Sequence, residues 1–198
     1  MNLESSTSPQ LSPQPRVFRQ TFARRALYRL RQFWLELWAR PSEVQLEQAR
    51  SVLTAPEMAL FLRMQPGEQA HCLNILFEMQ QHGHAHPGLL AAALLHDVGK
   101  VRYPLHIWER VLIVLAAAWL PRQARAWGDY HGQAPGWRKP FVVARQHAAW
   151  GAELAAQAGS PALTVALISR HQDHFAAAGR PEEDHLLACL QAFDNESY

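Results

Sequence analysis

The chain has 198 residues, of which 48% are apolar and 18% charged, with a formal net charge of +2 at neutral pH. This length fits one domain with an appendage, and the low charge predicts a large core. Leu and Ala dominate without any strand-like run of Val, Ile and Thr, which predicts an all-helical protein. The two cysteines, Cys72 and Cys189, are too far apart in sequence for a zinc ribbon or a disulfide framework. They are interpreted as buried thiols of a reducing cytoplasm.

Residues 1–15 are rich in Ser and Pro and are predicted to be a disordered tail. This polar start also argues against a secretory signal. Residues 16–40 contain seven arginines and one acid, Glu36, which gives them a net charge of +6. Because the whole chain carries +2 and Glu4 is the only charge before Arg16, residues 41–198 sum to −3. The basic character is therefore local.

The basic segment also has an apolar face at helical spacing, and residues 16–54 are predicted to form a basic amphipathic helical extension. One interpretation docks its aromatic stripe on the rest of the protein. Another places it on an anionic membrane surface, with the protein cytoplasmic and peripheral. Nucleic acid has little support, because no nucleic-acid-binding module is recognisable. The residues of the apolar face are Phe18, Phe22, Ala26, Leu30, Phe33 and Leu37.

The remainder, residues 55–198, is predicted to be one helical domain. The sequence from Thr54 to Glu57 has the form of a capping box and starts its first helix. Residues 121–139 contain several Gly and Pro and are expected to be a loop with one short helix. The expected helices are 54–63, 66–82, 89–97, 104–120, 141–158, 161–171 and 182–193.

The longest apolar run is VLIVLAAAWLP, residues 111–121. A membrane-spanning helix needs about 20 such residues, so this run is too short to cross a bilayer. We expect a helix buried in the protein, with a patch dipping into a membrane surface as the alternative.

His96 and Asp97 stand where an apolar residue is expected. They end a helix, 89–97, that is apolar on every side and therefore predicted to be buried. A buried carboxylate without a partner costs several kcal/mol. Either hydrogen bonds and a cation compensate for Asp97, or a metal ion does.

The same feature recurs in four other predicted helices, which place His71, His147, His171 and Asp194 at interior positions. Taken alone, each of these residues would be interpreted as a buried polar residue with its hydrogen bonds satisfied. Together with His96 and Asp97 they offer six nitrogen and oxygen donors that could hold one or two divalent ions. Such donors, without a thiolate, suit Mn, Fe, Mg, Co, Ni or Zn.

The segment LLHDVGK resembles the signature of the HD-domain metal-dependent phosphohydrolases, in the HD-[IV]-G variant. GEQAHCLNIL resembles the family's first histidine segment, and HAAWGAELAAQAGSPALTVALISRH its later one. LLACLQAFDN resembles its terminal aspartate helix. The likeness covers about residues 55–197, and the order H…HD…H…H…D is far more specific than the dipeptide alone. It implies an HD-domain-like helical bundle.

The resemblance also implies a ligand set. His71, His96, Asp97 and Asp194 would hold one ion, and Asp97 would bridge to a second ion held by two more histidines, His147 and His171. In the binuclear branch of the family the second-site histidine is often doubled. Gln172 stands at the position of the additional histidine, so the second site is one ligand short, and His174 is expected to be solvated instead.

A divalent ion lowers the pKa of bound water and polarises phosphoryl oxygens. Asp97 is the candidate to orient the attacking water, and Lys100 or Arg102 to neutralise charge on the phosphoryl group. Lys100 has an alternative interpretation as a cation at a helix C-terminus. The sequence thus predicts hydrolysis of a phosphomonoester, phosphodiester or nucleotide. The alternative is a catalytically weak binding or regulatory module, associated with a membrane surface.

Overall fold

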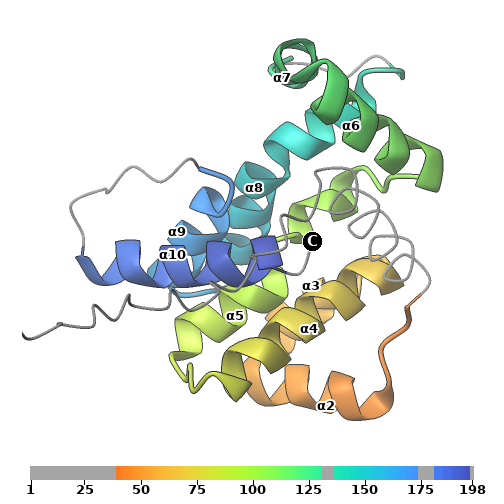
Figure 1. Cartoon of the computed structure of the whole chain (residues 1–198). Helices are drawn as coiled ribbons and strands as arrows, with labels where there is room; N and C mark the ends of the chain where they lie inside the picture. The colour runs from red at the N-terminus through yellow and green to blue at the C-terminus, as the bar shows by residue number, and fades with distance from the viewer. Residues whose placement is uncertain (1–38, 131–135, 174–180, 197–198) are drawn as a thin grey trace, which may run out of the picture.

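The computed structural model describes residues 39–130, 136–173 and 181–196 (Figure 1). These residues form helices joined by turns and contain no strand. The helices are α2 (Glu43–Val52), α3 (Ala55–Phe61), α4 (Pro66–Gln81), α5 (Pro87–Leu95), the 3-10 helix η1 (Val98–Arg102), α6 (Ile107–Trp119), α7 (Pro121–Gly128), α8 (Lys139–Gln157), α9 (Ala162–Arg170) and α10 (Pro181–Glu196). The predicted all-helical bundle is confirmed. The tail 1–15 and most of the basic segment, up to residue 38, lie outside the described residues.

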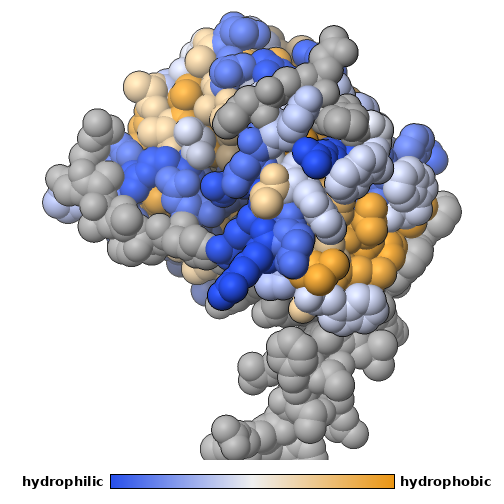
Figure 2. All heavy atoms as spheres, turned by 90° about the horizontal axis from the view of Figure 1, so that it is seen from above, coloured by the Kyte–Doolittle hydropathy of each residue, from blue (hydrophilic) through white to orange (hydrophobic). Residues whose placement is uncertain are grey.

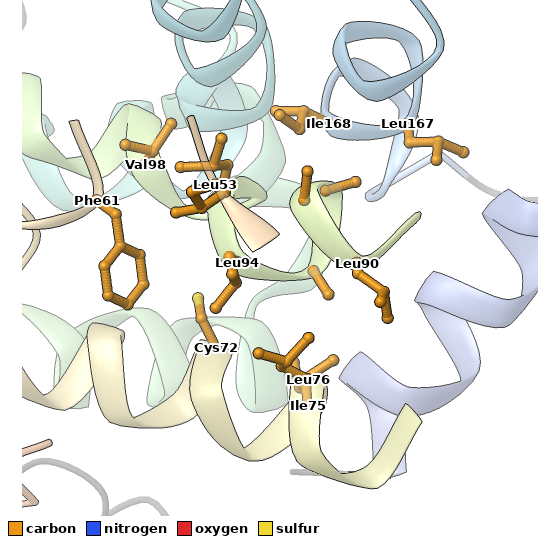
Figure 3. Packing of buried hydrophobic residues seen from close by; sticks show 14 of the residues in the cluster. Leu53, Phe61, Cys72, Ile75, Leu76, Leu90, Leu94, Val98, Leu167 and Ile168 are labelled. Carbon is orange, nitrogen blue, oxygen red and sulfur yellow. The ribbon is translucent and has the colours of Figure 1, made fainter. Parts of the chain in front are cut away.

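Helix α5 is the centre of the bundle. Every residue from Leu89 to Leu95 is buried, as expected for a helix that is apolar on all sides. Leu90 and Leu94 of α5 face α4, where Leu94 lies beside Cys72, and Ile75 and Leu76 belong to the same core (Figure 3). Helices α9 and α10 also pack against α5, and α8 packs against α9 and against η1, which follows α5 (Figure 1).

Helix α2 belongs to this bundle, although its residues were predicted to be part of the N-terminal extension. Ser42 and Gln45 form a capping box that starts the helix. Ala49 and Leu53, at its end, are buried in the same core as α5. The packed unit therefore begins before residue 55.

The predicted capping box at Thr54 also fixes a long-range contact. The Glu57 carboxylate accepts a hydrogen bond from the Thr54 backbone N–H at 2.9 Å and another from Ser160 Oγ at 2.6 Å. Burial alone would raise the pKa of Glu57, but these hydrogen bonds lower it. The start of α3 is thus tied to the turn between α8 and α9.

We expected the apolar run 111–121 to be buried, and this prediction was wrong. The run lies in α6, where only Glu109 and Ala116 are buried among the residues of this fully described helix. Residues 121–128 form α7, which agrees with the one short helix expected within 121–139. The two cysteines also differ from each other: Cys72 is a buried free thiol, whereas Cys189 is half-buried. None of the helices in the described ranges has the length and apolarity needed to cross a bilayer.

Two glycines allow η1 to cross α8 at close range. A Cβ on Gly99 would lie far inside contact distance of the His147 carbonyl oxygen and 2.7 Å from the Gly151 nitrogen. A Cβ on Gly151 would lie 3.2 Å from the Gly99 nitrogen. The group that approaches α8 beside His147 is therefore the backbone that follows Asp97.

We expect Gly99→Ala to destabilise the protein by about 3 kcal/mol, because overpacking against rigid backbone cannot relax by side-chain movement. The melting temperature should fall by about 10 °C for a chain of this size. Gly136→Ala is the matched control, since no atom lies within 4 Å of a Cβ placed there. Equal melting temperatures for the two variants, measured by circular dichroism, would contradict the tight crossing.

Candidate metal centre

Five helices deliver the six predicted ligands to one place. His71 comes from the middle of α4, and His96 and Asp97 follow the last turn of α5. His147 lies in α8, and His171 follows the last residue of α9. These five residues are buried, while Asp194 on α10 is half-buried.

The donor atoms form two groups that share Asp97. One atom each of His71, His96 and Asp97 lies within 4.8 Å of the others, and the same holds for Asp97, His147 and His171. Asp194 adds its Oδ1, at 3.2 Å from His71 Nε2 and 3.5 Å from His96 Nε2. Asp97 Oδ1 lies 3.2 Å from His147 Nε2. The predicted convergence of six side chains is therefore present in the structure.

Backbone carbonyls orient three of the imidazole rings. The Nδ1 atoms of His96, His147 and His171 lie 3.0, 2.9 and 2.8 Å from the carbonyl oxygens of Ala93, Val143 and Ile168. A carbonyl can only accept, so each Nδ1 must carry a proton and donate it. In the neutral ring Nε2 then keeps its lone pair, which is the form that binds a metal.

Opposite charges in the cluster lie close to one another and shift each other's pKa values. Burial would raise the pKa of Asp97, but Lys100 and His96 hold it well below the usual range of an aspartate. Burial would also raise the pKa of Asp194, and His96 and His71 lower it. For His171, burial and the neighbouring His96 and His147 lower the pKa to about 3. Both carboxylates are thus anionic and His171 is neutral at physiological pH.

Lys100 and Arg102, the two predicted phosphate-binding residues, have different surroundings. Lys100 Nζ lies 2.5 Å from Asp97 Oδ2. Burial would lower the pKa of Lys100, but Asp97 and Glu68 raise it, so Lys100 stays charged. Arg102 instead donates to Glu153 at 2.6 Å and lies over the Trp150 ring. The structure therefore brings Lys100 to the cluster and pairs Arg102 outside it.

Sequence reasoning missed an ion pair next to Lys100. Arg110 Nη2 donates to Glu68 Oε1 at 2.6 Å and to Gln65 Oε1 at 2.8 Å. Both charged residues act on the pKa of Lys100. The sequence feature that could have predicted this pair is Arg110, a charge at the edge of an apolar run. Its spacing from other residues does not identify Glu68 as the partner.

The residues fit a divalent cation. His96 Nε2 is buried and makes no hydrogen bond to any described residue, although the two carboxylates face it. A polar atom buried in this way normally has a partner. The nearby Cys72 thiol lies 3.8 Å from Nδ1 of His96, on the opposite side of the ring, and burial raises the pKa of that thiol. The donors at the centre are therefore imidazole nitrogens and carboxylate oxygens.

The second group remains limited to three residues among the described ones. Gln172, where the resemblance leads us to expect an additional histidine, is exposed. His174 lies outside the described residues. His71, His96, Asp97 and Asp194 therefore offer four residues to a possible ion, whereas Asp97, His147 and His171 offer three.

Comparison with protein families matches residues 70–198 to the HD domain, and the chain belongs to this family. The predicted family membership is confirmed. HD domains usually bind divalent metals and generally belong to metal-dependent phosphohydrolases, which agrees with the His/Asp clusters found here. No curated protein and no solved structure shows significant similarity to the chain.

We expect His96→Ala to lower the affinity for Mn²⁺ at least about tenfold, because it removes a donor at the centre of the first group. After equilibration with Mn²⁺ and desalting, the His96→Ala variant should retain less manganese than the unsubstituted protein, as measured by mass spectrometry. His185→Ala is the control, since His185 is exposed on α10. Equal metal content in both variants would show that this cluster is not the binding site.

Metal binding should also release a proton near neutral pH. Burial would lower the pKa of His96, but the neighbouring Cys72, Asp97 and Asp194 together outweigh it and raise this pKa well above the usual range. Below that raised pKa the ring is protonated, so an ion must displace about one proton, and metal affinity falls as the pH falls. Calorimetry in buffers of different ionisation enthalpy measures this release. A heat independent of the buffer would contradict the prediction.

Proposed function

We propose that the protein is a divalent-metal-dependent hydrolase of a phosphomonoester, phosphodiester or nucleotide. The single observation that carries this proposal is the convergence of four imidazoles and the carboxylates of Asp97 and Asp194, with Lys100 beside Asp97. Family membership supports the same reaction class. A divalent ion bound there would supply an activated water and would polarise the phosphoryl oxygens.

The residues of the chain have distinct roles in this proposal. His71, His96, Asp97 and Asp194 would hold one ion, and Asp97, His147 and His171 would hold a second. Because the pKa of Asp97 is lowered, its carboxylate is available to accept a hydrogen bond from the attacking water and to orient it.

Lys100 supplies positive charge for the phosphoryl group. Its side chain is 16% exposed and that of Asp194 is 20% exposed, whereas the side chains of His96 and Asp97 are 1% and 5% exposed. Solvent therefore reaches the cluster at Lys100 and Asp194, and a substrate phosphate entering there meets the ammonium group. Arg102 contributes less, because it pairs with Glu153 outside the cluster.

The proposed substrate is a phosphorylated small molecule or nucleotide encountered in the cytoplasm. The segment 16–40 is proposed to contact an anionic membrane surface, on the basis of its local charge and apolar face. A second candidate function is a binding or regulatory module with little turnover. The exposure of Gln172, which leaves the second group with three donors, favours that alternative.

Asp97→Asn should lower kcat/KM at least about a thousandfold, because the amide cannot hold the ion or the water as a carboxylate does. Lys100→Met should lower it about a hundredfold through loss of the charge at the phosphoryl group. The assay is Mn²⁺-dependent hydrolysis of p-nitrophenyl phosphate and bis-p-nitrophenyl phosphate.

The control for this series is Asp129→Asn, which changes an exposed carboxylate that pairs with Arg145. It should retain activity within about twofold, as exposed pairs contribute little. Activity that survives Asp97→Asn would contradict the proposed hydrolase. Stoichiometric metal without turnover in the unsubstituted protein would support the regulatory alternative.

A further inference from the structure

Helix α6 has its apolar side toward the solvent, the reverse of an ordinary surface helix. At 3.6 residues per turn, its exposed large side chains fall within an arc of about 140°. The buried Glu109 and Ala116 lie on the opposite side. Trp119 is 75% exposed and Trp108 is 59% exposed, so the arc has a tryptophan in both its first and last turns. The exposed side chains are Ile107, Trp108, Val114, Leu115 and Trp119.

The arc belongs to a larger hydrophobic surface at one end of the molecule. Helices α6 and α7 form the upper end in Figure 1. Figure 2 views this end from above and shows a hydrophobic patch beside strongly hydrophilic residues. Leu120, between the two helices, and Trp137, just before α8, are also exposed. An apolar surface of this kind marks a docking site.

The exposed charged side chains of α6 and α7 are both positive, and the exposed acid that follows α7, Asp129, pairs with Arg145 at 2.9 Å. The structure describes every residue from Ile107 to Gly128, and the exposed charged residues among them are Arg122 and Arg125. The single acid of this stretch, Glu109, is buried and pairs with Lys139 at 3.2 Å. Any partner of this face must therefore offer apolar material together with negative charge.

We propose that α6 and α7 form a docking face for an anionic lipid surface, a role independent of the proposed hydrolysis. Tryptophans at both ends of an apolar helix, with arginines beside it, are typical of a helix that lies in the membrane interface. Its thirteen residues span about 20 Å, less than the hydrocarbon core of a bilayer, so α6 lies along the surface.

The charge of this face disfavours two other partners, a second copy of the protein and the protein's own segment 16–40. In a twofold contact between copies, Arg122 and Arg125 would meet a face that exposes no acid between Ile107 and Gly128. The protein's own segment 16–40 carries +6, so docking it here would bring like charges together. An anionic lipid surface instead attracts both the face and the segment.

Sedimentation with vesicles tests the docking face. The full chain should bind vesicles of phosphatidylcholine with 30% phosphatidylglycerol and should not bind pure phosphatidylcholine. Trp119→Glu and Trp108→Glu should each weaken binding at least about tenfold, since each places an acid in the membrane interface. Val44→Glu is the matched control, because Val44 is 72% exposed on α2, outside this face, and it should change binding less than twofold. Higher salt should weaken binding.

Circular dichroism on the same samples detects unfolding of a variant, and light scattering detects a protein dimer. Both substituted tryptophans are exposed, so the variants should retain the melting temperature of the unsubstituted protein. Absence of binding by the full chain, or equal binding by Trp119→Glu and Val44→Glu, would overturn the proposal. So would a protein dimer that Trp119→Glu dissociates without effect on vesicle binding. Loss of binding in Arg24→Gln with Arg29→Gln, but not in Trp119→Glu, would assign the contact to the basic segment and also overturn it.

Discussion

The burial of Asp97 is the constraint on which the rest of the site depends. Its carboxylate lies at the end of a helix that is buried on every side, where an unpaired charge would be very unfavourable. Lys100 and the imidazole of His147 lie next to its two oxygens, and a second carboxylate, Asp194, lies across the His96 ring. A cluster with two carboxylates and four imidazoles is tolerable in a protein interior when a cation is shared among them.

The bundle is arranged so that this cluster can form. Backbone carbonyls hold the Nδ1 side of His96, His147 and His171, and thereby direct the Nε2 atoms toward Asp97. Gly99 and Gly151 let η1 and α8 approach closely enough to bring Asp97 beside His147. The Arg110–Glu68 pair then links the start of α6 to α4 next to Lys100. Packing, glycine placement and charge pairing thus serve the same site.

The sequence predicted the helices, and the six side chains that it singled out converge in the structure, because each interrupts an apolar pattern at a definite helical position. It failed where the outcome depended on distant residues. The apolar run of α6 predicted burial, but hydrophobicity alone does not reveal whether a helix packs in a core or against an external surface, and Trp119 is exposed. The partners of Arg102 and Arg110, Glu153 and Glu68, lie 51 and 42 residues away. Residues 43–52 joined the bundle because Ala49 and Leu53 fit its core.

The most direct test of the shared cation is a crystal structure of the Mn²⁺-loaded protein with anomalous diffraction at the manganese edge. We predict an anomalous peak in contact with His71, His96, Asp97 and Asp194, at ligand distances of about 2.0–2.4 Å. A second, weaker peak beside Asp97 would have His147 and His171 as ligands. A map in which these six residues have no anomalous peak among them, while Mn²⁺ occupies another part of the molecule, would contradict the central claim.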